Sequence, residues 1–255
     1  RSLVFDAGQP QEDLFICDAD GSHLRALTDD PAWDRGPRWS PDGRQVGFYS
    51  DRSGQWESWI INRDGSGLKP LGAPYHMPIW SPDGSRMTAV DFREGITFIL
   101  DGHKSWAEQS PEVLRGPASD RESALATRLT DLLGSVPGPV PSASSFMATS
   151  WSPDGNSVAG YTGEGIAIYS LPSKQYHVLT RDGGTWPCAW LNDNRRILYL
   201  RQDRLALVDT DSRKVMEVLS VLPDTLGRFT ISRDNQELYI VRASNEADIW
   251  LANLK

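Results

Sequence analysis

The 255-residue sequence is poor in cysteine, in long apolar runs and in basic residues. Its two cysteines, Cys17 and Cys188, are too few for a disulfide scaffold or a cysteine-rich zinc cluster. Both lie in apolar stretches, where we expect buried, unreactive thiols. No run of about 18 apolar residues occurs, so the sequence predicts no transmembrane helix within this chain.

Acidic residues outnumber basic ones, 34 to 26, which gives a formal net charge of −8 at pH 7. Binding to nucleic-acid phosphates or to an anionic membrane surface requires clustered Lys and Arg. We therefore expect no nucleic-acid partner and no direct membrane contact from this chain. Hydrophobic residues make up 39% of the sequence, which is enough to fill the core of a folded domain.

Sequence motifs of catalysis are also lacking. There is no Gly-x-Ser-x-Gly nucleophile turn, no glycine-rich phosphate loop and no pair of histidines at metal-binding spacing. The four histidines are scattered along the chain. These absences predict a protein that is not an enzyme and that binds no cofactor and no metal.

A short repeat is the strongest positive feature of the sequence. The pentapeptide Trp-Ser-Pro-Asp-Gly occurs at 39–43, 80–84 and 151–155, and weaker copies occur at 190–194 and 231–235. From the residue numbers, successive copies start 41, 71, 39 and 41 residues apart. Propeller blades repeat every ~40–45 residues and contain four strands each. The spacing therefore predicts a β-propeller.

Each copy of the repeat has the chemistry of a tight turn between two strands. Proline fixes φ, and Asp-Gly supplies the reversal into the next strand. Apolar or alternating stretches follow each copy, so each unit is expected to contain an inner, a second, a third and an outer strand. We predict an all-β, six-bladed propeller whose inner strands end at the following residues: Trp39, Trp80, Trp151, Trp190 and Ile231.

The repeat divides the chain into six expected blades within one domain, residues 1–255. Their approximate bounds are 1–37, 38–78, 79–149, 150–188, 189–229 and 230–255. The first expected strand, 2–5, is a second strand, and the last, 250–254, is a third strand with no outer strand after it. We therefore expect that the chain is a part of a longer protein, which supplies the missing inner and outer strands.

One interval is longer than a blade. The 71 residues between Trp80 and Trp151 exceed a blade by about 31, and the surplus falls at 116–145, after an outer strand expected at 112–114. Ser119 begins a helical pattern that ends before Gly134, so we predict a short helical insertion near 119–134. Two interpretations remain open: a loop packed on the propeller, or a lid or partner-binding element.

These turns resemble those of the TolB-like, WD-type propeller repeat family of bacteria. The resemblance rests on the Trp-Ser-Pro-Asp-Gly turns, on Ser50–Gly54, and on the Asp-Gly-Ser turns at 18–22 and 62–66. It implies a non-catalytic scaffold or sensor domain that binds a protein or ligand, as one module of a larger bacterial protein such as a receptor-like kinase or an envelope complex. It also implies a periplasmic or other extracytoplasmic location.

The mouth of the central channel is the expected binding site, because loops from outer to inner strands meet there. A protein, peptide or small-molecule ligand is expected. The residues around the position four or five before each aligned Trp do not repeat, so they are free to specify a ligand. The candidates are Trp33, Asp34, Arg35, Tyr75, His76, Phe146, Met147, Trp186 and Arg228.

Two other functions remain open. The chain could be the propeller that gates the catalytic domain of a prolyl-peptidase-type hydrolase. It could also be a lyase or lactonase acting at the channel mouth. That enzyme would need carboxylates or histidines that converge on a metal, and only Asp34 and His76 are placed for this.

Overall fold

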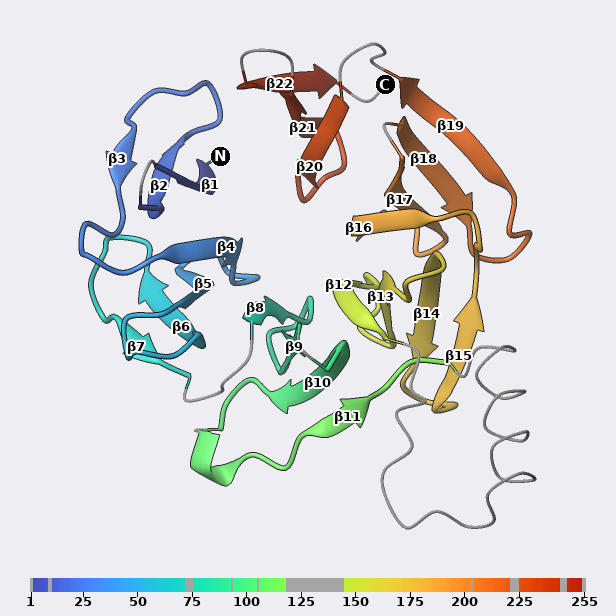
Figure 1. The fold of residues 1–255 in the computed structure, drawn as a ribbon, viewed down its shortest axis with the longest axis horizontal. Helices are drawn as coiled ribbons and strands as arrows, with labels where there is room; N and C mark the ends of the chain where they lie inside the picture. Colours follow the sequence, from blue (N-terminus) through green and yellow to red (C-terminus); the bar gives the residue numbers. More distant parts are fainter. Residues whose placement is uncertain are drawn as a thin grey trace, which may run out of the picture. The chain divides into compact units, whose positions relative to one another are not determined.

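The computed structural model describes residues 2–8, 11–71, 76–92, 94–104, 106–117, 145–202, 204–220, 225–243 and 247–253. Its described residues belong to two compact units, Arg1–Leu114 and Arg115–Lys255 (Figure 1). The helix predicted near 119–134 lies outside the described residues. The helical structure among the described residues is a single 3₁₀ turn, Trp106–Glu108.

The first unit consists of three antiparallel sheets, each built from strands that follow one another in the chain. The first sheet contains β1 (Ser2–Ala7), β2 (Asp13–Asp18) and β3 (Arg25–Ala26). The second contains β4 (Asp34–Trp39), β5 (Gln45–Ser50), β6 (Glu57–Asn62) and β7 (Lys69–Pro70). The third contains β8 (His76–Trp80), β9 (Arg86–Asp91), β10 (Ile96–Asp101) and β11 (Glu112–Leu114).

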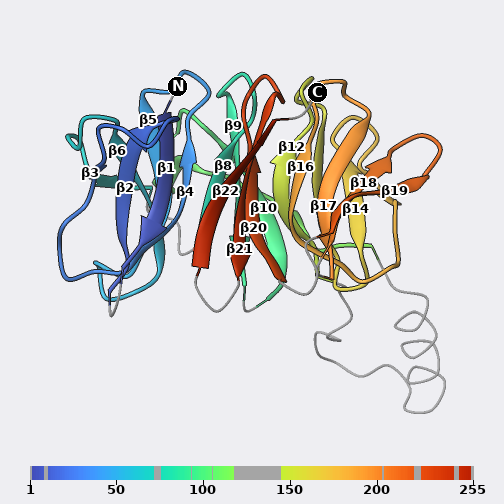
Figure 2. The same cartoon turned by 90° about the horizontal axis from the view of Figure 1, so that it is seen from above.

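The second unit repeats this arrangement. Its first sheet contains β12 (Met147–Trp151), β13 (Ser157–Tyr161), β14 (Ile166–Ser170) and β15 (Gln175–Val178). The next contains β16 (Gly184–Trp190), β17 (Arg196–Arg201), β18 (Arg204–Asp209) and β19 (Val215–Ser220). The last contains β20 (Thr225–Ile231), β21 (Glu237–Ala243) and β22 (Ala247–Asn253). In the side view, the strands of each sheet run alongside one another between turns at two opposite ends (Figure 2).

The predicted strand ends are confirmed. Strands β4, β8, β12, β16 and β20 end at the five aligned positions, Trp39 to Ile231. The outer strand expected at 112–114 is β11. Among the described residues, four sheets have four strands and two have three.

Each repeated turn is fastened by its serine and aspartate side chains. The Ser40 hydroxyl donates to Oδ1 of Asp42 at 2.6 Å and accepts the backbone N–H of Gln45 at 2.9 Å. The same serine-to-aspartate bond recurs at Ser81, Ser152 and Ser232. Because this network closes the loop locally, the repeat fixes the hairpin between first and second strands wherever it occurs.

The fifth residue of the turn has a left-handed backbone. Gly43 has φ +69°, and the weaker copies place Asn194 and Asn235 there with φ +57° and +55°. Asparagine tolerates this conformation better than most residues with a side chain. The sequence drift of the last two copies therefore preserves the turn.

Neighbouring sheets in the first unit pack through large rings over small residues. A Cβ atom built on Gly47 of β5 would lie 2.7 Å from the ring of Trp80, which ends β8. Phe48 and Val46 of β5 face the other neighbouring sheet and join Leu14 of β2 in a fully buried cluster. The β4–β7 sheet is therefore apolar on both faces.

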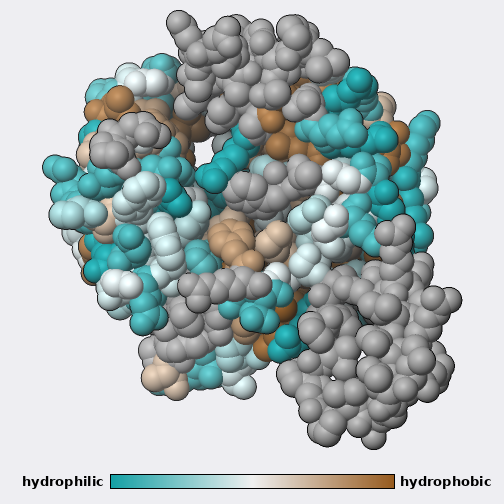
Figure 3. All heavy atoms as spheres, in the orientation of Figure 1, coloured by the Kyte–Doolittle hydropathy of each residue, from teal (hydrophilic) through white to brown (hydrophobic). Residues whose placement is uncertain are grey.

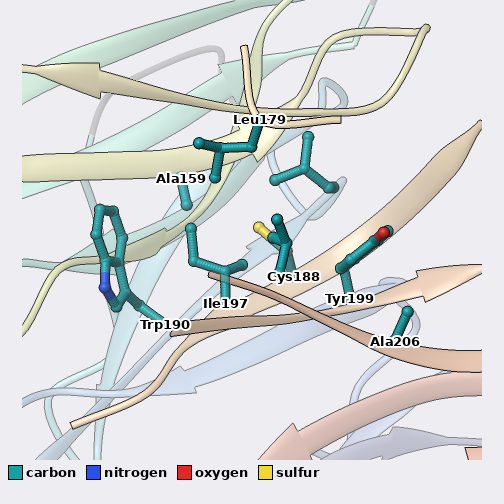
Figure 4. Close-up of a cluster of buried hydrophobic side chains, with 9 residues drawn as sticks. Ala159, Leu179, Cys188, Trp190, Ile197, Tyr199 and Ala206 are labelled. Carbon is teal, nitrogen blue, oxygen red and sulfur yellow. The ribbon is translucent and has the colours of Figure 1, made fainter. Parts of the chain in front are cut away.

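Figure 4 shows the corresponding packing in the second unit, between the β12–β15 and β16–β19 sheets. Trp190 and Ile197 lie close to Ala159 of the preceding sheet, and Cys188 lies in the middle of the cluster. Burial raises the pKa of Cys188 to about 12, although a hydrogen bond with the Thr149 hydroxyl acts in the opposite direction. Cys17 is buried as well, so the expectation of buried thiols is confirmed.

We predict that acid unfolds the protein partly through its turn aspartates. Hydroxyl donors from Ser81 and Ser85 lower the pKa of Asp83 from 3.8 to about 2. The folded state thus prefers the charged form, and this stabilisation is complete above pH 3.8 and disappears as the pH falls towards 2. Thermal melts of Asp83→Asn from neutral pH to about pH 2 should depend less on pH than those of the wild type. Asp211→Asn, which removes an exposed charge, is the matched control and should leave the wild-type slope unchanged.

The Gly47–Trp80 contact gives a second prediction. Gly47→Ala should destabilise the protein by about 1–3 kcal/mol, because the added methyl group overlaps a packed ring. Chemical denaturation measures the loss. In a Trp80→Leu background the same substitution should cost clearly less. An equal cost in both backgrounds would show that the ring is not the obstacle.

Candidate functional site

A β-bulge interrupts the first strand of every sheet that has one of the aligned turns. The register shifts lie between Arg35 and Arg38 in β4 and between His76 and Ile79 in β8. Equivalent shifts occur in β12, β16 and β20. In the bulges of β4 and β8, Gly36 has φ +61° and Met77 has φ +55°. Bulges redirect side chains at the ends of sheets, and here they do so at the predicted mouth positions.

At the bulged ends of β4 and β8, five rings and one arginine form a connected cluster. We define this aromatic cluster as Trp33, Arg35, Tyr49, Trp56, His76 and Phe92. The His76 ring centre lies 4.7 Å from that of Phe92 and 5.2 Å from that of Tyr49. All members of the cluster belong to the first unit. Figure 3 shows apolar surface beside hydrophilic surface around β4 and β8.

Arg35 forms the polar centre of the aromatic cluster. Its guanidinium carbon lies 4.6 Å from the ring centre of Trp33 and 5.3 Å from that of Trp56. The same group forms an ion pair with Glu12, which directly precedes β2. Trp33 and Phe92 remain 37% and 43% exposed, so the cluster presents two accessible aromatic side chains to solvent.

Asp34, the neighbour of Arg35, has a different environment. Its carboxylate is fully buried and accepts two hydrogen bonds from Nη2 of Arg52, at 2.7 and 2.8 Å. Arg52 also pairs with Asp30 at 3.1 Å and lies over the ring of Trp59. The structure therefore places Asp34 inside an ion-pair network that joins the β3–β4 connection to the turn after β5.

Carboxylates surround the aromatic cluster. Asp6 accepts the backbone N–H of Gly36, and Asp51 accepts that of Trp33. Burial raises the pKa of Asp13, and the negative charges of Asp34, Asp29 and Asp30 raise it further, whereas a backbone hydrogen bond from Asp30 lowers it. The smaller contributions from Asp34, Asp29 and Asp30 reflect several carboxylates close together at this end of the first unit.

The remaining predicted site residues belong to the second unit, apart from Tyr75, which lies outside the described residues. Phe146 is fully buried and packs edge-on against Tyr176, with 5.2 Å between ring centres. Met147 is half-buried at the start of β12, and Arg228 is exposed in β20. Trp186 lies in β16, but its side chain is not among those described.

The aromatic cluster thus contains three of the candidates, Trp33, Arg35 and His76, and Trp33 and Arg35 are in direct contact. Sequence reasoning missed Tyr49, Trp56 and Phe92. Tyr49 is the next-to-last residue of β5, Trp56 directly precedes β6, and Phe92 directly follows β9. In an antiparallel pair, the end of one strand lies beside the start of its partner, so residues at both places share one edge of the sheet. The expected pairing of the strands was therefore the signal in the sequence that pointed to these residues.

Neither a metal centre nor a membrane-spanning helix occurs among the described residues. No group of three or more His, Cys, Asp or Glu side chains there is arranged to hold a metal ion. The described segments contain no helix with the length and apolarity that crossing a bilayer requires.

Sequence comparisons find related stretches in several proteins, among them a peptidase and a Tol-Pal system protein. A 99-residue stretch is 44% identical to the uncharacterized peptidase YuxL of Bacillus subtilis, covering 36% of this chain and 15% of YuxL. Another 99-residue match is 33% identical to the Tol-Pal system protein TolB of Anaeromyxobacter dehalogenans, covering 38% of this chain and 23% of that protein. The matches thus span less than a quarter of these relatives. No family model matches the chain.

Comparison of structures identifies the fold. TolB from Acinetobacter baumannii superposes with a TM-score of 0.69 at 15% identity, over 99% of this chain and 60% of that one. A prolyl endopeptidase superposes with a TM-score of 0.54 at 15% identity, over 96% of this chain and 38% of that one. The expected resemblance is confirmed: the chain has the all-β, TolB-like propeller fold with four-stranded blades.

We predict that Asp34 serves stability. Asp34→Ala should destabilise the protein by about 3 kcal/mol, because it leaves the largely buried Arg52 charge without its main partner. Chemical denaturation measures the loss, and adding Arg52→Met should restore part of it. Glu164→Ala, which breaks an exposed ion pair with Arg181, should cost less than about 1 kcal/mol. Equal costs for the two single variants would contradict this role.

Proposed function

We propose that the chain is a non-catalytic interaction module of a larger bacterial protein, and that the aromatic cluster is its binding surface. The observation that carries the proposal is that exposed Trp33 lies against Arg35 and exposed Phe92 against His76, within one aromatic cluster at one end of the first unit. Aromatic residues and arginine are the residue types that most often dominate protein–protein binding energy.

The TolB-like fold supports an interaction role in an envelope complex, because one sequence relative is named as a Tol-Pal system protein. By the same likeness we propose an extracytoplasmic location. The predicted role as a sensor, for example as a module of a receptor-like kinase, is part of the same proposal. It differs from the role in an envelope complex only in the domain to which this chain is attached.

We further propose that the six sheets are six blades. In the β1–β3 sheet, the strands correspond in order to the second, third and outer strands of a complete sheet. In the β20–β22 sheet, they correspond to the first, second and third. An unpaired sheet edge readily accepts another strand. An inner strand beside β1 and an outer strand beside β22 would complete both blades.

A second candidate is a propeller that gates a peptidase domain. It is favoured by the match to YuxL and by the superposition with a prolyl endopeptidase. The two functions differ in what lies beyond this chain: a hydrolase domain on the same polypeptide supports the peptidase. A lyase or lactonase reaction at the mouth has weaker support, because Asp34 is already fully paired within the fold.

The binding surface can be tested by site-specific crosslinking in the native host. A photoreactive phenylalanine analogue at position 92 should give a crosslinked species of higher mass, because that side chain is 43% exposed within the aromatic cluster. The same analogue at Met216, an exposed position of β19, is the matched control and should give none. The full-length protein should also resist labelling by a fluorophosphonate probe for serine hydrolases.

Crosslinks at Met216 but not at position 92 would reject the aromatic cluster as the binding surface. Labelling of the full-length protein by the probe would favour the peptidase alternative. Both outcomes are read from the same cell extract by gel mobility and mass spectrometry.

A further inference from the structure

The first unit contains a surface on which exposed aromatic rings and carboxylates lie together. Trp33 is the last residue before β4, and its backbone N–H donates to Asp51 at 2.8 Å. Glu12 pairs with Arg35, whose guanidinium stacks on the Trp33 ring. Aromatic and acidic groups therefore share one continuous surface at the start of β4.

Negative charge exceeds positive charge on this surface. The described carboxylates on or near it are Asp6, Glu12, Asp13, Asp29, Asp30 and Asp51, whereas Asp34 is fully buried and pairs with Arg52. The described cations among them are Arg35 and Arg52, and each is already paired with a carboxylate of this set. Asp29 is exposed, and Glu12 and Asp30 keep 27% and 35% of their side-chain surface accessible. An approaching ligand therefore encounters a net negative potential.

The geometry points to a basic polypeptide segment as the ligand, bound through arginine side chains that stack on Trp33 and Phe92 and pair with Asp29, Asp30 and Glu12. This inference rests on the proposed function and specifies the chemistry of the partner. Arg35 already shows the mode of binding, since its guanidinium lies 4.6 Å from the Trp33 ring centre while it pairs with Glu12. Guanidinium groups stack on aromatic faces and pair with carboxylates at the same time.

An acidic or purely apolar segment fits this surface less well. An acidic segment would have to displace Glu12 from Arg35 against the surrounding carboxylates. An apolar segment would bury the carboxylates without a partner, which costs free energy. Lysine should bind more weakly than arginine. Its compact ammonium group stacks less well on aromatic rings than a guanidinium group and cannot form a bidentate pair with a carboxylate.

The test uses purified chain and short fluorescent peptides that alternate serine with arginine, lysine or glutamate. Fluorescence anisotropy at about 0.15 M salt, which screens long-range attraction, should rank their affinities as arginine, then lysine, then glutamate. Trp33→Ala and Phe92→Ala should each weaken arginine-peptide binding by about fivefold, the equivalent of losing one partly exposed cation–π contact. Each variant is first checked for an unchanged melting temperature.

Charge variants test whether peptide binding depends on this surface or on the net negative charge of the whole chain. Asp29→Asn should weaken the arginine peptide, whereas Asp211→Asn, an exposed charge in the second unit, should leave its affinity unchanged. Glu12→Gln should weaken the arginine peptide and strengthen the glutamate peptide, because Arg35 then loses its own partner. Equal effects of Asp29→Asn and Asp211→Asn, or preference for the glutamate peptide, would overturn the inference. Crosslinking at position 92 without binding of the arginine peptide would reject a basic ligand but would still support the aromatic cluster as the binding surface.

Discussion

The packing of one sheet against the next is the constraint on which the rest of this structure depends. A four-stranded antiparallel sheet leaves two faces to be covered, and in the β4–β7 sheet both faces are apolar. Trp80 fits against β5 because Gly47 has no side chain, and Trp190 lies in the same kind of cluster near Ala159. The repeated Trp is thus a spacer between sheets, and the small residue of the preceding sheet is its necessary counterpart.

The turn after each Trp holds this spacer at a fixed place. Because the Ser40 hydroxyl bonds both Asp42 and the N–H of Gln45, the end of β4 and the start of β5 are fixed within one hairpin. The bulge between Arg35 and Arg38 separates the end of β4 at Trp39 from its start at Asp34. The two parts of one strand therefore serve different purposes: Trp39 packs between sheets, whereas Arg35 reaches the aromatic cluster.

Much of the fold could be predicted from the sequence because its signals are local. Turn residues and the alternation within strands lie within a few residues of the elements that they determine. The spacing of about 40 residues is read directly along the sequence. The ends of β4, β8, β12, β16 and β20 were therefore predicted to the residue. The bulges and the aromatic cluster could not be predicted in the same way, because Tyr49 meets His76 only after two sheets have packed.

Asp34 and Arg35 show where single-sequence reasoning about the site reaches its limit. Both were predicted at the channel mouth and both are charged, yet Asp34 is fully buried, whereas the Arg35 side chain is 29% exposed. Alternation along a strand requires that adjacent side chains face opposite ways, but it does not say which one faces inward. Arg52, eighteen residues later in the sequence, decides this by supplying a buried counter-charge for Asp34. Because Asp34 pairs with Arg52, the neighbouring Arg35 faces Trp33, Trp56 and Glu12. The carboxylates that balance these two arginines also form the acidic surface that we propose selects a basic ligand.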